Sequence, residues 1–285
     1  MKNTNLFQDL NYEDYLAKNP IHDLVGVNLE EYGDINSKQV KPTFFSVDPT
    51  NQDSYPPELD DLIRLHYLVT KRKTTTVMEF GLGRSSIVLA NALSINKEKY
   101  SSEVSKLRRS NPFELHSIEN NMGWIEYTKK HYENRLGDDN DIVNLHYCPL
   151  EVSEFNGRVC TYYHNIPNIS PDLIYLDGPD QFSAGGSLRG LGTNHADRMP
   201  MAADILSFEH FLCPGTLIVL DGRTANARFL KCNLQRNWSY CHDYDLDQHF
   251  FELVEVPLGI YNNDYINFAL GSDWFSDNYI DFSNK

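Results

Sequence analysis

The sequence predicts an α/β protein built around a doubly wound β-sheet with helices on both faces. Two observations indicate this class. Short segments that are β-branched or apolar alternate with amphipathic helical segments from about residue 57 onward. The clearest of them, residues 216–220, is almost entirely apolar, as strands buried on both faces of such a sheet are.

The expected elements follow one another regularly. A first helix is expected over residues 57–73, where leucines recur at three-residue steps before a basic stop. Strands are expected at 74–80, 113–118, 141–147, 171–176 and 216–220, with the last strands supplied by 238–257 and 263–271. Further helices are expected at 85–93, 122–136, 201–212 and 224–236. We interpret residues 97–112 as a surface insertion and 152–168 as a polar hairpin or loop.

The chain divides into two unequal parts. Residues 1–56 are polar, rich in aromatic side chains and interrupted by prolines, which is typical of an extension. Residues 57–285 carry the alternating pattern and are expected to form one domain, because a chain of 285 residues suits one large domain with an added segment.

Composition excludes several classes of protein. The chain has 25 Lys and Arg against 40 Asp and Glu, so its net charge is 25 − 40 = −15, and no basic face for nucleic acid is expected. No stretch approaches the roughly 18 apolar residues that a membrane span needs, and the N-terminus lacks an apolar signal segment. The five cysteines form no C-x-x-C pair. We therefore expect a cytoplasmic protein that binds neither nucleic acid nor membrane.

The first strand is followed by a glycine turn, E-F-G-L-G-R-S-S, at residues 79–86. Gly81 and Gly83 allow a tight turn and the close approach of a nucleotide-like ligand, and Ser85 or Ser86 is placed to cap the next helix. The third glycine of the dinucleotide fingerprint is missing. Glu79 would repel a pyrophosphate, so this turn favours a ligand with a cationic portion.

The next two strands also end at informative residues. Glu119 closes the second strand, and a carboxylate at this edge of the sheet can accept both hydroxyl groups of a ribose. Cys148, Pro149 and Leu150 follow the third strand and offer an apolar edge for an adenine ring.

The fourth and fifth strands both end in aspartate. They read D-L-I-Y-L-D-G, ending at Asp177, and P-G-T-L-I-V-L-D-G, ending at Asp221. Together with the glycine turn and the acid that closes strand two, these motifs resemble class I S-adenosylmethionine-dependent methyltransferases. The resemblance covers roughly residues 57–271 and leaves the N-terminal segment unmatched.

The resemblance implies a Rossmann-like, seven-stranded, mostly parallel sheet with an antiparallel last strand, and S-adenosylmethionine as the cofactor. It implies that Gly81 and Gly83 make room for the cofactor, that Glu79 lies near its methionine amine and that Glu119 holds its ribose. Leu150 would flank the adenine, and Asp177 would lie close to the reacting methyl group. The full set of residues expected to bind the cofactor is Glu79, Gly81, Gly83, Ser85, Glu119, Asn120, Leu150 and Asp177.

Three residues are candidates for the catalytic base, in falling order Asp177, Asp180 and His195. His195 belongs to a glycine-bearing loop, residues 181–198, which we interpret as a lid over the substrate. Asp177 and Asp221 could together bind Mg²⁺, as a similar pair does in metal-dependent O-methyltransferases. There another oxygen ligand normally follows the second aspartate. Gly222 follows it here, so Mg²⁺ is not the favoured interpretation.

The sequence therefore predicts methyl transfer to a small or medium polar acceptor, with a hydroxyl oxygen as the most suitable atom. Methyltransferases that act on planar nitrogens resemble one another in a P-P-Y/F element after strand four, whereas this chain has D-G-P-D. Two alternatives stay open: an NAD(P)-dependent oxidoreductase that uses the same glycine turn, and a non-catalytic nucleoside-binding protein with the same fold. The expected partner is a small-molecule acceptor, and a homo-oligomer stays open as well.

Overall fold

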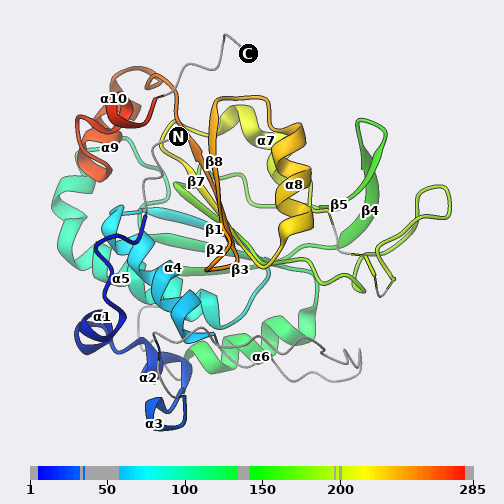
Figure 1. Ribbon diagram of the computed structural model, residues 1–285, viewed down its shortest axis with the longest axis horizontal. Helices are drawn as coiled ribbons and strands as arrows, with labels where there is room; N and C mark the ends of the chain where they lie inside the picture. The colour runs from blue at the N-terminus through cyan, green and yellow to red at the C-terminus, as the bar shows by residue number, and fades with distance from the viewer. Residues whose placement is uncertain are drawn as a thin grey trace.

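The structure, a computed structural model, describes residues 6–32, 35, 58–133, 141–195, 197–198 and 201–279. At its centre lies a seven-stranded sheet in the order β3-β2-β1-β6-β7-β9-β8 (Figure 1). Its strands are β1 Thr76–Phe80, β2 Glu114–Glu119, β3 Val143–Tyr147, β6 Leu173–Leu176, β7 Leu217–Asp221, β8 Trp238–Asp243 and β9 Gln248–Leu253.

The sheet is mostly parallel. β3, β2, β1, β6 and β7 pair in parallel, and β9 runs antiparallel to both of its neighbours, β7 and β8. This confirms the predicted doubly wound, seven-stranded sheet with an antiparallel last strand. The strand order reverses between β1 and β6, and ligands of such sheets bind beyond the carboxyl ends of the strands at that point.

Helices cover both faces of the sheet (Figure 1). Strand side chains alternate in direction, so Phe80 and Leu220 pack with α7 and α8 while Val77 and Val219 pack with α4 and α5. The third predicted helix, α6, packs against β2 and β3. The bounds of these helices are α4 Leu59–Lys71, α5 Arg84–Val104, α6 Met122–Glu133, α7 Asp204–Phe208 and α8 Thr224–Asn233.

The described part of the N-terminal segment is helical and packs onto the domain. It forms α1 (Tyr12–Lys18), α2 (Ile21–Val25) and α3 (Leu29–Tyr32). Apolar side chains of α1 and α2 form one cluster with those of α4 and α5. The Tyr15 hydroxyl adds hydrogen bonds to His66 Nδ1 and Thr70 Oγ1, both at 2.8 Å. These helices therefore cover the outer side of α4.

Two sequence interpretations were wrong. Residues 97–104 continue α5 by two further turns, so they are not part of a surface insertion. Residues 263–271 were expected as a strand, but α9 spans Gly259–Ala269 and both final strands come from residues 238–253. The buried positions of α9 are spaced three or four apart, which is the period of a helix (Asn262, Tyr265, Ile266 and Ala269).

Other differences are smaller. The predicted hairpin is β4 (Leu150–Phe155) paired with β5 (Arg158–Tyr163), a two-stranded sheet beside the main one. The helix expected at 201–212 is reduced to α7 and a short 3₁₀ turn, Glu209–Phe211. The end of the helix expected at 122–136 lies outside the described residues beyond Glu133.

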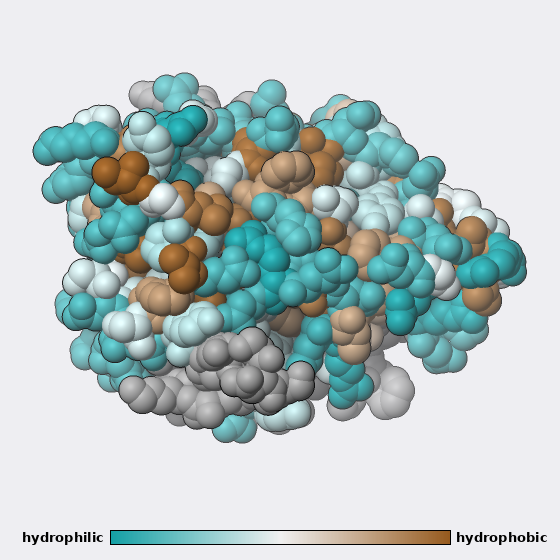
Figure 2. Space-filling model, turned by 90° about the horizontal axis from the view of Figure 1, so that it is seen from above, coloured by the Kyte–Doolittle hydropathy of each residue, from teal (hydrophilic) through white to brown (hydrophobic). Residues whose placement is uncertain are grey.

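The last helices lie at the amino-terminal end of β7, away from the candidate site. Asn262 of α9 donates a hydrogen bond to the Pro214 carbonyl at 3.2 Å, and α10 (Trp274–Asn278) follows. Seen from this end, apolar residues are interspersed with hydrophilic ones (Figure 2). None of the described helices is long and apolar enough to cross a membrane.

Candidate functional site

The loops after β1 and β6 touch through two glycines. Gly81 has φ +94°, and a Cβ at this position would lie 2.7 Å from the Gly178 backbone nitrogen. A Cβ on Gly178 would lie equally close, 2.7 Å from the Gly81 nitrogen. Any side chain at either residue would overlap backbone atoms. Gly81 therefore has to be a glycine because the loop after β6 packs directly against it. The sequence interpretation did not recognise this contact or the part that Gly178 plays in it.

Gly83 has a different environment. Its φ of −174° is extended backbone that any residue adopts. A Cβ there would meet only Ser85 Oγ, at 4.0 Å. The chain itself leaves this space open above the start of α5, which fits the expectation that Gly83 makes room for a ligand.

Glu79 is enclosed beneath this turn. Its side chain is fully buried, and its two oxygens accept hydrogen bonds from Ser85 Oγ at 2.6 Å and Ser117 Oγ at 2.5 Å. Burial raises the pKa of the Glu79 carboxyl to about 7, although these hydroxyl groups act to lower it. The Glu79 carboxyl group therefore contacts these hydroxyl groups and no solvent. In this structure Glu79 fixes Ser85, and hence the start of α5, to β2.

Replacing Glu79 by glutamine is expected to change how stability depends on pH. Because its pKa in the folded protein is about 7, above the ordinary 4.5, the stability that Glu79 contributes is complete below about pH 4.5 and is lost as pH rises through 7. Glutamine does not titrate. Between pH 5 and pH 8 the variant should therefore gain about 2–3 kcal/mol relative to the wild type.

Urea unfolding of both proteins at several pH values measures this difference. Burial also raises the pKa of Asp204 to about 7, so Asp204 makes the stability of both proteins depend on pH. Measuring the wild type at every pH cancels this shared contribution. A difference that stays constant from pH 5 to pH 8 would show that Glu79 does not titrate in this range.

Glu119 joins the end of β2 to the glycine turn. Its Oε1 accepts hydrogen bonds from the backbone N–H groups of Asn120 at 2.8 Å and Asn121 at 2.9 Å. Its Oε2 has a longer contact, 3.4 Å, with the N–H of Leu82. Burial raises the pKa of the Glu119 carboxyl, and these N–H groups lower it. Oε2 lies toward the turn that contains Gly83, and with this one long contact it is the oxygen placed to accept further hydrogen bonds.

Asn120 and Trp124 form hydrogen bonds to the loops on either side of Glu119. Asn120 Nδ2 donates to the Ser183 carbonyl at 3.3 Å, so its side chain ties the end of β2 to the 181–198 loop. Trp124 Nε1 donates to the Leu82 carbonyl, and its ring stacks on Tyr127 with centroids 5.2 Å apart. Sequence reasoning missed Trp124. Its position near the start of α6, after a strand-end acid, is a signal that could have been used.

Leu150 lies mostly inside the core. It is 7% exposed at the start of β4 and pairs with Tyr163 of β5. The Tyr163 ring in turn lies 5.9 Å from that of Phe80, the last residue of β1. Leu150 thus belongs to the same buried cluster as Phe80 at the end of β1. Its contact with an adenine stays a prediction.

Asp177 is exposed at the end of β6, with 53% of its side chain accessible. The Arg223 guanidinium lies beside it, with Nε 3.9 Å from Asp177 Oδ1, and is held by a 2.9 Å hydrogen bond from Nη2 to the Pro179 carbonyl. Arg223 itself is largely buried. Arg223 was not among the predicted site residues, although it is the residue directly after the strand-five motif.

The other two candidate bases are fixed differently. Asp180 is exposed, and its Oδ1 accepts a hydrogen bond from the Phe182 N–H at 2.8 Å, which forms a local turn. His195 is also exposed, and its Nδ1 accepts from the Asp197 N–H at 3.1 Å. The contacts described for His195 lie within the 181–198 loop, so the structure does not bring it to Asp177.

The 181–198 loop packs on the β4–β5 hairpin. The Gly185 N–H donates to the Leu150 carbonyl at 3.0 Å, and the Val152 N–H donates to the Gly185 carbonyl at 2.8 Å. Arg189 adds an ion pair of 3.4 Å with Glu154. Residue 196 lies outside the described part of this loop.

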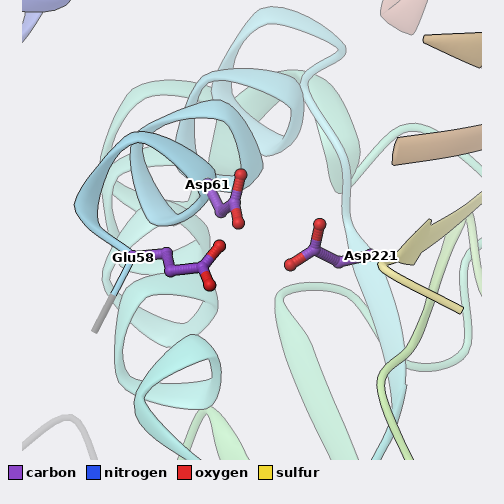
Figure 3. Close-up of side chains that lie close together, drawn as sticks. All are labelled: Glu58, Asp61 and Asp221. Carbon is purple, nitrogen blue, oxygen red and sulfur yellow. The ribbon is translucent and has the colours of Figure 1, made fainter. Parts of the chain in front are cut away.

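Asp221, one of the two aspartates considered for Mg²⁺ from the sequence, lies in a group of carboxylates. Among the described residues, the group of carboxylates close enough to share an ion consists of Glu58, Asp61 and Asp221 (Figure 3). Asp177 is not one of its members. Asp221 therefore gathers with the start of α4, whereas Asp177 lies beside Arg223.

Comparison with known proteins gives likeness in structure only. No family model matches the sequence, and no curated protein matches it. The O-methyltransferase from Bacillus cereus, solved in complex with SAH, is 13% identical, with 84% of this chain and 96% of that chain covered and a TM-score of 0.41. The methyltransferase PaMTH1 from Podospora anserina, solved with SAH bound, is 11% identical, with 70% and 80% covered and a TM-score of 0.40.

A third structure is TomG, an O-methyltransferase from Streptomyces achromogenes involved in tomaymycin synthesis, solved with SAM. It is 14% identical, with 87% of this chain and 92% of that chain covered and a TM-score of 0.36. The fold class of the present chain rests on its own strand order and register. It is a Rossmann-like, doubly wound, seven-stranded sheet, the fold that the resemblance to class I methyltransferases implied.

Proposed function

We propose that this protein transfers a methyl group from S-adenosylmethionine to a hydroxyl oxygen of a small or medium polar molecule. The observation that carries the proposal is the placement of Glu119. Its Oε2 lies at the carboxyl end of β2 and faces the glycine turn, where the backbone at Gly83 leaves open space. A carboxylate beside a bare strand-to-helix turn suits a ribose and a cationic sulfur better than it suits a pyrophosphate.

The residues present fit this cofactor. Glu119 is placed to accept hydrogen bonds from the ribose hydroxyl groups, and Gly83 offers the space beside it. Leu150 and Asn120 would border the nucleoside, while Asp177 stands exposed at the end of β6 on the acceptor side. Ser85 and Glu79 act from beneath, by fixing the start of α5. When bound, S-adenosylmethionine supplies an electrophilic methyl group on a sulfonium.

The chain itself has two tasks in this reaction. It must hold the acceptor oxygen in line with the methyl carbon, since positioning supplies most of the rate of such a displacement. It must also take up the hydroxyl proton, and Asp177 is the foremost candidate because it is exposed and anchored beside Arg223. Asp180 and His195 rank below it, because one oxygen of Asp180 and Nδ1 of His195 already accept local hydrogen bonds.

Titration calorimetry with S-adenosylhomocysteine and with NAD tests the proposal. We expect S-adenosylhomocysteine to bind and NAD to give no heat, because the turn at residues 79–86 lacks the third glycine of the dinucleotide fingerprint. Release of S-adenosylhomocysteine from S-adenosylmethionine should then follow addition of hydroxylated acceptors. Binding of NAD alone would replace the proposal with an oxidoreductase. If the cofactor binds but no such acceptor is methylated, the protein would be a non-catalytic nucleoside-binding protein.

A further inference from the structure

Three carboxylates from distant parts of the chain meet at the end of β7. Glu58 and Asp61 lie at the start of α4 and Asp221 is the last residue of β7, and one oxygen of each lies within 4.8 Å of the others. Figure 3 shows the three carboxyl groups turned toward one another across the gap between helix and strand. Like charges this close repel, so the folded chain needs a compensating positive charge.

Arg64 brings one positive charge to this group. Arg64 pairs with Asp61 Oδ1, but the same guanidinium also donates to Asp60 Oδ2 at 2.9 Å and to Gln248 Oε1 at 3.0 Å. Its single charge is thus shared between two aspartates. Glu58 and Asp221 bring two further carboxylates to the same place.

A buried oxygen of Asp61 is left without a partner. The Asp61 side chain is 4% exposed, and its Oδ2 is enclosed and accepts no hydrogen bond. Leaving a buried charged acceptor unsatisfied is costly, because its hydration is lost without replacement. Since Oδ1 is taken by Arg64, the second oxygen is available to the group formed with Glu58 and Asp221.

We propose that Glu58, Asp61 and Asp221 bind one divalent cation of the kind that prefers oxygen ligands, such as Ca²⁺, Mg²⁺ or Mn²⁺. This site differs from the Asp177–Asp221 pair considered from the sequence, because two of its ligands come from the start of α4. A bound cation ties the start of α4 to the end of β7, where Gln248 already links Arg64 to the β7–β9 ladder.

Binding of Mn²⁺ to the full-length protein, followed by the loss of its free electron paramagnetic resonance signal, tests this proposal. We expect one bound ion per chain. Glu58→Gln and Asp221→Asn should each weaken Mn²⁺ binding at least about tenfold, because each removes one charged ligand. The wild type should also melt at a higher temperature with Mn²⁺ than with EDTA, since an ion that binds only the folded chain stabilises it.

Asp60→Asn is the matched control. It removes a carboxylate from the same turn of α4, but Asp60 is not one of the three ligands, so Mn²⁺ affinity should stay within about threefold of the wild type. Asp61→Asn is less suitable, because it would also disturb the buried Arg64. Absence of binding at millimolar Mn²⁺, or binding that both ligand variants leave unchanged, would overturn the proposal. The measurement uses no cofactor, so its result is independent of the proposed methyl transfer.

Discussion

Glu119→Ala is expected to weaken S-adenosylhomocysteine binding by about 30- to 150-fold. This corresponds to about 2–3 kcal/mol, the range for hydrogen bonds made to a charged group. The physical reason is that Oε2 of Glu119 is the carboxylate oxygen that faces the glycine turn, and alanine offers the ribose hydroxyl groups no acceptor. Calorimetric titration of wild type and variant with the same ligand measures the change.

Glu126→Ala serves as the control for this substitution. It removes the same charge from an exposed position of the neighbouring helix α6 and should leave the affinity unchanged. Melting curves must accompany both variants, because Glu119 also accepts hydrogen bonds from the Asn120 and Asn121 backbone. If a folded Glu119→Ala protein binds as tightly as the wild type, Glu119 does not contact the ligand.

Gly178→Ala is expected to destabilise the protein by about 2–4 kcal/mol, because the new methyl group would lie 2.7 Å from the Gly81 nitrogen and 2.8 Å from its Cα. These are backbone atoms next to a central strand, so they cannot rotate away as a side chain could. The melting temperature should fall by about 5–15 °C. Thermal unfolding followed by circular dichroism measures the effect.

Gly83→Ala is the comparison that separates packing from binding. Its backbone is extended, and the added methyl group would meet no atom closer than Ser85 Oγ at 4.0 Å. We expect a melting temperature close to that of the wild type but weaker S-adenosylhomocysteine binding, because the methyl group occupies the space assigned to the ligand. An equal loss of stability in both variants would contradict the distinction drawn between the two glycines.

The two acids show how far sequence reasoning reaches in this site. Glu79 was placed correctly next to the end of the first strand and Glu119 at the end of the second, because strand boundaries follow from the apolar pattern. Their environments could not be inferred. Glu79 is closed off by Ser85 and Ser117, whereas Glu119 keeps an oxygen toward the turn. Which neighbours surround a side chain depends on β2 and α5 packing together, and the serine from β2 lies 38 residues away in the chain.

The error at residues 263–271 has a similar cause. A short segment that mixes apolar and polar residues fits a strand and a helix almost equally well. The outcome was decided by the space at the amino-terminal end of β7, where Asn262, Ile266 and Leu270 contact the segment that contains Pro214 and Gly215. Only residues three or four apart on a helix can face that segment together.

The sequence by itself determined the doubly wound sheet and the residues that end each strand, because periodicity and strand-end motifs are local properties. The antiparallel last strand was implied by the resemblance to class I methyltransferases. Tertiary structure alone decided that Gly81 needs Gly178, that Arg223 stands beside Asp177 and that Asp221 joins Glu58 and Asp61. Each of these contacts joins residues from about 45 to 160 positions apart. The distances between these residues depend on how the helices and loops pack against the sheet, and no local sequence pattern determines that packing.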